Sequence, residues 1–321
     1  MESKVSFSEK LTLASQKNNS LLCVGLDPDL QMLLPNTNNV FAFNRLIIEA
    51  TVDLACAYKP NLAIYESMGI EGLSALQQTL DFIRQADPDI PIIGDGKRGD
   101  IGTCSLAYAQ TLLENYKFDA VTVNPYMGSD ALKPFLDRKD KGVFVLCRTS
   151  NPGGMEIQEL LVAQGGVSRP LYEVVAELAL SWNRNGNVGL VVGATYPEQI
   201  SRVREICPNM LFLIPGVGAQ GGSIEKTVRS AVDAEGRGFI INVSRQIMYA
   251  ARTPTGTQSR DSEAVRKMRH VARQLKNEIN SYLPIPLKKA PKQVCRDHED
   301  QIRPGKPCQK TESSVVAVGG T

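Results

Sequence analysis

The sequence predicts an α/β protein whose single domain is a closed barrel of eight parallel strands, each followed by a helix. Two observations carry this prediction. Eight short runs rich in Val, Ile and Leu are continuous rather than alternating, which suits parallel strands buried on both faces. Segments with helical spacing separate these runs, and eight such units in one chain favour a (β/α)8 TIM barrel. With 321 residues and 42% hydrophobic content, the chain can bury such a core.

The expected elements follow one another with little interruption up to residue 283. The strands are expected at Leu21–Leu26, Ala57–Tyr65, Pro91–Gly94, Ala120–Asn124, Gly142–Cys147, Val188–Gly193, Met210–Ile214 and Gly238–Val243. Helical spacing is clear over Phe41–Leu54, Ile70–Ala86, Leu171–Trp182, Gln199–Ile206 and Asp261–Leu283. Residues 1–283 are therefore expected to form the barrel domain.

Two regions fall outside this pattern. Asn151–Arg169 is a long, glycine-containing connection after the fifth strand, either a mobile loop over a site or a tolerated insertion. Residues 284–321 are rich in Pro, Lys, Gln and Ser without an apolar period, so a disordered tail is expected there. Cys295, His298 and Cys308 lie in this tail, at a spacing that fits no standard zinc pattern.

Composition excludes several classes of function. The net charge of +2, with acids and bases interspersed, favours neither a nucleic-acid groove nor a membrane-surface helix. No apolar run approaches the ~20 residues that span a bilayer, and the polar N-terminus lacks a signal core, so a cytoplasmic protein is expected. The two histidines, His270 and His298, nearly exclude a Ser-His-Asp or Cys-His mechanism and a multi-histidine metal site. The seven scattered cysteines are expected to be reduced, mostly buried thiols.

Polar residues and glycines cluster just after the expected strands, where a barrel builds its active site. These clusters are Asp27, Lys59, Asp95–Asp100, Asn124, Thr149–Asn151, Gly216–Gly222, and Ser244 with Arg245. Turn chemistry alone is the alternative explanation, but turns do not require Lys, Arg and Asp at such regular positions. The sequence therefore predicts a charged site at the carboxyl ends of the strands.

The segment from Gly94 to Ile101, Gly-Asp-Gly-Lys-Arg-Gly-Asp-Ile, is the strongest signal. Asp95 and Lys97 are two residues apart on a strand, so both side chains are expected to face the barrel mouth. A solvated turn ending in a helix-capping Asp100 is the alternative. Lys59 at another strand end weakens that alternative, because two lysines and two aspartates at one mouth can form an alternating network that keeps the lysines protonated.

Six segments, in chain order and each at a strand end, resemble the orotidine 5′-phosphate decarboxylase family, specifically its longer, type 2 group. They are Val24–Asp29, Tyr58–Asn61, Asp95–Gly102, Val123–Tyr126, Arg148–Gly153 and Pro215–Gly222. The resemblance extends from Leu21 to Met248, which is nearly the whole barrel. It implies a carboxy-lyase of pyrimidine biosynthesis that converts orotidine 5′-phosphate to uridine 5′-phosphate without cofactor or metal. It also implies a homodimer with shared active sites.

The resemblance further implies the role of each catalytic residue. Lys97 donates the proton to C6 of the pyrimidine as CO2 leaves, while Asp95, Lys59 and the partner subunit's Asp100 complete the charged array. Ile101, also from the partner, lines an apolar pocket. Because no cofactor motif offers an electron sink, the protein itself must stabilise the carbanion, and a fixed ammonium can do so before protonating the carbon.

The same resemblance assigns the groups that bind substrate. Asp27 and Lys59 hold the ribose hydroxyls, and Ser150 meets the edge of the pyrimidine ring. Gln220 and Gly221, within the glycine-rich segment after the seventh strand, bind the phosphate together with Arg245. Glycines let backbone N–H groups approach a phosphate, and arginine can clamp its oxygens. The alternative for these residues is a glycine-rich turn with a solvated arginine.

The sequence departs from the family pattern at one position. Cys104 stands where the family usually has threonine, with Thr103 just before it, and a thiol is a weaker hydrogen-bond donor than a hydroxyl group.

Two other functions are possible alternatives. A related barrel that decarboxylates a sugar phosphate with Mg2+ shares the Asp-x-Lys-x-x-Asp spacing. A non-catalytic nucleotide-binding barrel is the second alternative, but the four charged positions are all present.

Overall fold

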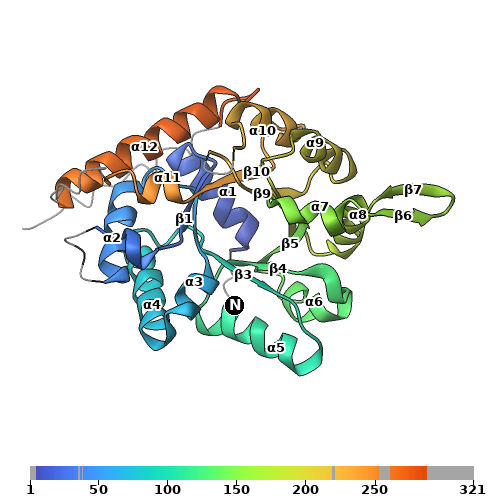
Figure 1. Ribbon diagram of the computed structural model, residues 1–321, viewed down its shortest axis with the longest axis horizontal. Coiled ribbons are helices and arrows are strands. Elements are labelled where there is room, and N and C mark those ends of the chain that lie inside the picture. Colours follow the sequence, from blue (N-terminus) through green and yellow to red (C-terminus); the bar gives the residue numbers. More distant parts are fainter. Residues whose placement is uncertain (1–4, 35–36, 38, 219–220, 253–260, 288–321) are drawn as a thin grey trace, which may run out of the picture. The chain divides into compact units, whose positions relative to one another are not determined.

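The computed structural model describes residues 5–34, 37, 39–218, 221–252 and 261–287. All of them belong to one compact unit, Met1–Ala290. Within this unit, strands and helices alternate along most of the chain, as Figure 1 shows.

Eight parallel strands form one sheet, in the order β2-β1-β10-β9-β8-β5-β4-β3. Their bounds are β1 Leu22–Leu26, β2 Ala57–Pro60, β3 Ile93–Arg98, β4 Ala120–Val123, β5 Gly142–Arg148, β8 Val188–Val192, β9 Leu211–Pro215 and β10 Phe239–Val243. The two end strands, β2 and β3, are joined by the bridges Tyr58–Ile92 and Asn61–Asp95. The sheet therefore curls round on itself, and the expected TIM barrel is confirmed.

Helices surround the sheet. They are α1 Phe7–Asn18, α2 Val40–Thr51, α3 Leu62–Ser67, α4 Gly69–Ala86, α5 Gly102–Gln110, α6 Ser129–Leu136, α7 Met155–Gln158, α8 Leu171–Trp182, α9 Pro197–Ile206, α10 Ile224–Ala231, α11 Arg245–Met248 and α12 Asp261–Ser281. A π-helical turn, Thr111–Asn115, extends α5. The expected second strand was too long, because Asn61 accepts a hydrogen bond from the N–H of Ala63 and starts α3 directly after Pro60.

The apolar residues form two separate clusters. The larger one lies where the helices pack against the outside of the sheet. The smaller one includes Cys23, Ile93, Phe144 and Ile240, which come from four different strands of the barrel. Strands that are buried on both faces need apolar residues at every position, which explains their continuous Val, Ile and Leu runs.

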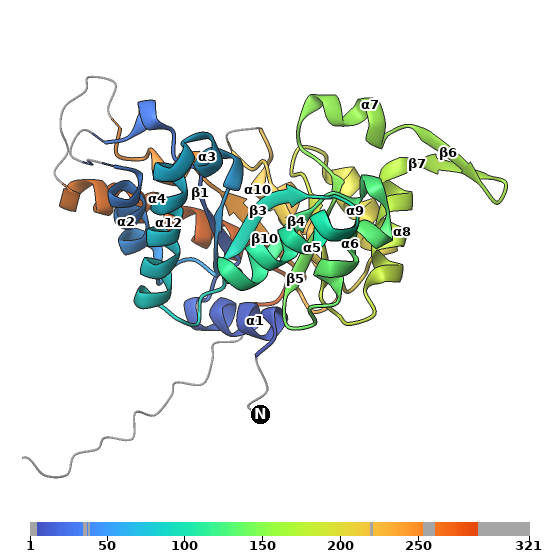
Figure 2. The same ribbon diagram turned by 90° about the horizontal axis from the view of Figure 1, so that it is seen from below.

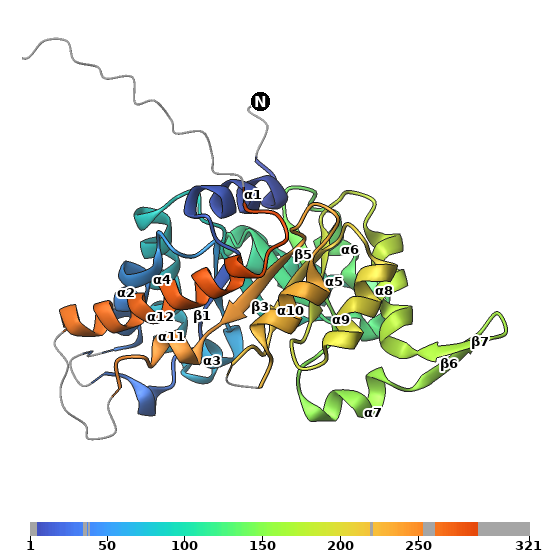
Figure 3. The same ribbon diagram turned by 90° about the horizontal axis from the view of Figure 1, so that it is seen from above.

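Helix α1 closes one end of the barrel, a feature that the sequence patterns did not predict. Figures 2 and 3 show it across the end opposite to α3 and α7. Ser6 and Glu9 form a reciprocal capping box that starts the helix. The ring of Phe7 meets that of Phe144 edge-on, with centroids 5.7 Å apart, and Phe7 and Leu11 belong to the smaller cluster. The open end is therefore the one formed by the carboxyl ends of the strands.

The connection after β5 is a folded insertion and not a plain loop. It contains α7 and an antiparallel hairpin, β6 Leu161–Gln164 and β7 Val167–Pro170, which extends away from the barrel in all three ribbon views. Gly165 and Gly166 have φ of 61° and 81°, which suits glycine at a tight hairpin turn. Leu161 and Val167 expose 70% and 62% of their surface, so the hairpin presents apolar side chains to its surroundings.

The packed part of the chain reaches past the boundary expected at residue 283. Leu287 is buried in the larger apolar cluster. The rest of the expected tail, residues 288–321, lies outside the described residues. Four of the described cysteines are buried and free, at 23, 56, 147 and 207, while Cys104 is exposed. No helix within the described part of the chain is long and apolar enough to cross a membrane.

Phe7→Ala is expected to destabilise the protein by about 3 kcal/mol, because it leaves a cavity against Phe144 at the closed end of the barrel. The measurement is the free energy of unfolding in urea. Leu13→Ala, on the same helix but 54% exposed, is the control and should change it by less than about 0.5 kcal/mol. Equal losses in the two variants would mean that α1 is not anchored through Phe7.

Candidate active site

A cavity of about 1250 Å³ is lined by residues at the carboxyl ends of the strands. It brings together six of the residues that the sequence singled out: Asp27, Lys59, Asp95, Lys97, Ser150 and Arg245. They come from β1, β2, β3, β5 and β10 or from the segments directly after these strands. Residues separated by more than two hundred positions in the chain therefore share one site.

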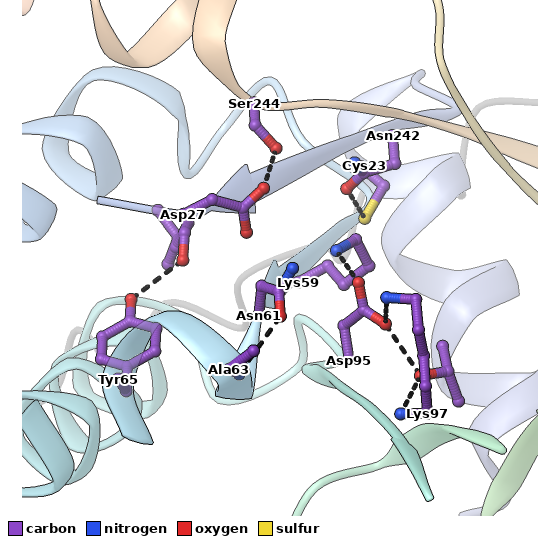
Figure 4. A network of polar contacts seen from close by, with 12 residues as sticks. Cys23, Asp27, Lys59, Asn61, Ala63, Tyr65, Asp95, Lys97, Asn242 and Ser244 are labelled. Atoms are coloured by element: carbon purple, nitrogen blue, oxygen red, sulfur yellow. Dashed lines mark hydrogen bonds and ion pairs between the residues drawn. The ribbon is translucent and has the colours of Figure 1, made fainter. Parts of the chain in front are cut away.

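Asp95 is the centre of a charged array, shown in Figure 4. Its Oδ2 accepts a hydrogen bond from Lys59 Nζ at 2.6 Å, and its Oδ1 accepts one from Lys97 Nζ at 2.6 Å. Asp95 and Lys59 are 7% and 3% exposed, whereas the side chain of Lys97 is 46% exposed. One buried carboxylate thus holds two ammonium groups at the cavity, one on a buried side chain and one on a half-exposed side chain.

The two buried members of the array stabilise each other's charge. Burial by itself would raise the pKa of Asp95, but the ammonium groups of Lys59 and then Lys97 outweigh it and hold that pKa well below its usual range. Burial by itself would lower the pKa of Lys59, but the carboxylates of Asp95 and Asp27 outweigh it and raise the pKa. Both groups are therefore charged at neutral pH.

The backbone around Lys97 is irregular, unlike the regular strand that the sequence predicted. Lys97 has a φ of 48°, in the left-handed region, and β3 shifts its register against β4 between Gly94 and Arg98. Asp95 and Lys97 do converge, as predicted. They do so on a distorted segment and not through the alternation of a regular strand.

Asp27 is held in place by Ser244, which directly follows β10, and by Met248 of α11. Its Oδ2 accepts a hydrogen bond from Ser244 Oγ at 2.6 Å, and its backbone N–H lies 3.3 Å from Met248 Sδ. A Cβ on Gly25 would lie 1.9 Å from Ser244 Oγ, so glycine is required for Ser244 to reach Asp27. The second oxygen, Oδ1, is buried without a hydrogen-bond partner among the described residues. Such an atom is an acceptor available to a bound hydroxyl group.

Arg245 and the glycine-rich loop meet at one side of the cavity. Gly216, Val217 and Gly218 line it together with Arg245. Gly218 has a φ of 72°, and a Cβ there would lie 2.7 Å from Gln246 Oε1, so the loop passes close to α11. Gly221, in contrast, is exposed and donates its N–H to Gly218 O at 2.8 Å.

Gln220, another expected site residue, lies outside the described residues. Asp100 and Ile101 do not line the cavity of their own chain: Asp100 Oδ1 accepts the N–H of Ile101 at 2.7 Å, and Ile101 is 56% exposed. Cys104, at the position where the family usually has threonine, is likewise exposed on the first turn of α5.

Ser150 is positioned by a buried arginine whose role the sequence did not reveal. Arg148 is fully buried at the end of β5, and its guanidinium donates to Thr149 O at 2.7 Å, Gln199 Oε1 at 2.6 Å and Glu159 Oε1 at 2.8 Å. These bonds tie the segment that carries Ser150 to α9 and to the connection after α7. The sequence did contain a signal for Arg148, because a charged residue stands directly after the apolar run Gly142–Cys147.

Thr122 on β4 is a second residue that sequence reasoning missed. Its hydroxyl donates to Asp95 Oδ1 at 2.8 Å and accepts the N–H of Lys97 at 2.9 Å. Within an apolar strand a threonine looks like an ordinary β-branched residue, so the sequence offered no distinguishing signal. The described residues contain no group of three or more His, Cys, Asp or Glu side chains arranged to hold a metal ion.

Comparison with known proteins gives consistent matches over most of the chain. Residues 20–258 match the model of the "Orotidine 5'-phosphate decarboxylase / HUMPS family". The orotidine 5′-phosphate decarboxylase of Ralstonia pickettii is 50% identical over 281 residues, covering 86% of this chain and 98% of that protein. The enzyme of the same name from Cupriavidus metallidurans is 48% identical over 283 residues, covering 87% of this chain and 99% of that protein.

Two solved structures of proteins with related names are also similar to this chain. The structure of Leishmania donovani OMP decarboxylase is similar with a TM-score of 0.74 and 40% sequence identity, covering 87% of this chain and 99% of that chain. The structure of UMP synthase from the same organism is similar with a TM-score of 0.75 and 42% identity, covering 87% of this chain and 56% of that chain.

Asp95→Asn is expected to lower the free energy of unfolding at pH 5 by about 3 kcal/mol, because it leaves Lys59 buried without its partner. The folded pKa of Asp95 lies below the unfolded value of about 3.9, so its contribution is full above pH ~4 and is lost as the pH falls further. The gap between wild type and variant should therefore narrow from about pH 5 to about pH 3.

The measurement is urea unfolding at the two pH values. Asp137→Asn is the matched control, because Asp137 pairs with Lys133 at the surface, where its side chain is 58% exposed. A gap that stays constant or widens toward low pH would contradict the depressed pKa of Asp95.

Proposed function

This chain belongs to the orotidine 5′-phosphate decarboxylase family and converts orotidine 5′-phosphate to uridine 5′-phosphate in pyrimidine synthesis, and we propose that Lys97 is the proton donor of that reaction. The observation that carries the proposal is the array of Lys59, Asp95 and Lys97 at the cavity wall. It places a fixed ammonium group beside a carboxylate in a site where the described residues offer no metal cluster.

The substrate is proposed to span the cavity from the charged array to Arg245. The guanidinium of Arg245, with the backbone of Gly216–Gly218 and with Gln220 and Gly221 farther along the loop, binds the phosphate. Asp27 Oδ1, buried without a partner among the described residues, accepts a ribose hydroxyl, and Lys59 donates to the ribose. Ser150 then meets the edge of the pyrimidine ring. Because the phosphate is remote from C6, its binding energy helps to place the reacting ring.

The chemical step needs one proton and no external electron acceptor. The bond between C6 and the carboxylate breaks, CO2 departs, and the electron pair stays on C6. Lys97 Nζ stabilises this charge and transfers a proton to C6, which yields uridine 5′-phosphate and a neutral lysine. The side chain of Lys97 is 46% exposed at the cavity, so it regains its proton from solvent after product leaves.

The array acts by being fixed before the reaction begins. Asp95 Oδ1 holds Lys97 Nζ at 2.6 Å, so little reorganisation is needed when charge develops on C6. Leu146, Val191 and Leu213 add an apolar part to the cavity wall. Apolar surroundings exclude water and strengthen the attraction between the ammonium group and the carbanion.

A homodimer with shared active sites is proposed to complete each site. Asp100 and Ile101 do not line the cavity of their own chain and lie on the segment that leaves β3. Around them, Leu106, Tyr126 and Met127 expose 43%, 85% and 44% of their surface on segments that leave the neighbouring strands β3 and β4. A two-fold axis through this surface would deliver Asp100 and Ile101 to the partner's cavity.

A cytoplasmic location is proposed as well. Two of the relatives named above, from Ralstonia pickettii and Cupriavidus metallidurans, are bacterial orotidine 5′-phosphate decarboxylases. The described cysteines are free thiols, as is usual in a reducing compartment.

Lys97→Ala is expected to abolish decarboxylation while leaving a folded protein that binds uridine 5′-phosphate with nearly unchanged affinity. Lys97 supplies the proton and the transition-state charge, whereas phosphate and ribose contacts supply most of the ground-state affinity. The measurements are loss of orotidine 5′-phosphate absorbance and calorimetric titration with the product. Near-normal turnover in the folded variant would rule out Lys97 as the proton donor.

Lys97→Ala and Asp100→Ala chains, each nearly inactive alone, are expected to regain activity when they are unfolded and refolded together. In a mixed dimer one shared site receives both defects and the other receives neither. With random pairing, roughly a quarter of all sites should be intact. Turnover is compared with that of wild type refolded in the same way. If verified mixed dimers stay as inactive as their parents, Asp100 acts within its own subunit.

A further inference from the structure

Thr122 occupies the one irregular position between β3 and β4. Ile93 pairs with Ala120 and Gly94 with Val121, but the next pair along the ladder is Arg98 with Val123. Asp95, Gly96 and Lys97 therefore lie opposite the single residue Thr122. A bulge of this kind breaks the ladder of backbone hydrogen bonds and re-aims the side chains that it carries.

The bulge leaves the backbone of Lys97 in need of an acceptor. Its N–H finds one in the side chain of Thr122, with Oγ1 at 2.9 Å, instead of in a carbonyl of β4. The φ of Lys97 is 48°, a conformation that costs free energy for any residue except glycine. A contact that fixes this N–H therefore also fixes the strained backbone from which the lysine side chain leaves.

The direction of both hydrogen bonds follows from the chemistry of the hydroxyl group. An N–H can only donate, so Thr122 Oγ1 is the acceptor toward Lys97, and its own hydrogen is left for Asp95 Oδ1 at 2.8 Å. The same Asp95 oxygen accepts the Nζ of Lys97 at 2.6 Å. Thr122 is 1% exposed, so its hydroxyl is shielded from solvent. The hydroxyl of Thr122 thus binds the backbone of Lys97 directly, and it also binds the Asp95 carboxylate that holds the Lys97 side chain.

We propose that Thr122 is a positioning residue for decarboxylation, because its hydroxyl sets the place of the Lys97 ammonium group relative to C6. This inference rests on the proposed function of Lys97 as proton donor. Thr122 need not touch the reacting atoms. It acts through the bulge of β3, by satisfying the Lys97 N–H and by orienting the Asp95 carboxylate.

Two variants of Thr122, compared with one control, separate the effect of the hydroxyl from that of the side-chain shape. Thr122→Val keeps the shape and removes both hydrogen bonds, while Thr122→Ser keeps the hydroxyl and removes the methyl group. Thr227→Val is the matched control, because Thr227 is fully buried in α10 and its hydroxyl has no partner among the described residues. It should resemble wild type in both stability and turnover.

The measurements distinguish positioning from general stability. In Thr122→Val, the single-turnover rate of decarboxylation should fall about 10- to 100-fold, as expected when a reacting group is misplaced. Affinity for uridine 5′-phosphate should stay within about threefold of wild type, because the proposed phosphate and ribose contacts are unchanged. Hydrogen exchange of the Lys97 amide, followed by NMR, should become faster. Thr122→Ser should restore the rate to within about threefold of wild type and restore amide protection.

Several results would overturn the inference. A folded Thr122→Val variant with the wild-type rate would show that the hydroxyl is not needed. Equal rate losses in Thr122→Ser and Thr122→Val would assign the effect to the methyl group. An equal loss of product affinity would make Thr122 part of the binding pocket. Failure of the proposed function looks different: turnover by Lys97→Ala would refute that proposal, whereas an inactive Lys97→Ala beside a fully active Thr122→Val refutes this inference alone.

Discussion

The buried ion pair between Lys59 and Asp95 is the interaction on which the site depends. Their side chains are 4% and 9% exposed, and removing either partner leaves a charge that the interior cannot solvate. A buried pair of this kind adds little net stability compared with a well-packed apolar pair, so stability alone does not account for it. Its effect is to fix a carboxylate that in turn holds Lys97 at the cavity. The barrel supports this pair by anchoring its members on β2 and β3, the two strands at which the sheet closes.

The segment that carries Asp95 and Lys97 departs from regular structure, and its surroundings compensate for the departure. Lys97 adopts a left-handed backbone conformation on a bulged strand, and the buried hydroxyl of Thr122 satisfies the N–H that the bulge exposes. Barrel strands on both sides hold their register, so the irregularity stays local. Strain of this type persists where the rest of the fold over-determines the geometry, and here it aims the ammonium group.

Two other residues of the cavity, Asp27 and Ser150, lie on segments that are held in place by further side chains. Ser244 reaches Asp27 because Gly25 leaves the space, and Arg148 ties the Ser150 segment to α9 through Gln199. Ser244 is 217 positions from Asp27 in the chain, and Gln199 is 51 positions from Arg148. These contacts tie the site to the barrel, even though its lining residues lie at strand ends and in loops.

The sequence by itself determined the barrel and six of the residues that line the cavity. Continuous apolar runs specify strands that are buried on both faces, and charged residues directly after them must gather at one end of a parallel barrel. Local patterns could not reveal α1 as the cover of the other end of the barrel, because its short sequence mixes polar and apolar residues. Its place depends on the contact of Phe7 with Phe144, a residue far away in the chain. Nor could local patterns reveal the roles of Thr122 and Arg148, whose importance lies in partners far away in the chain. The convergence of Asp95 and Lys97 was predicted from strand alternation, but the tertiary structure achieves it through a bulge, because register is decided by pairing with β4 and not by the residues of β3 alone.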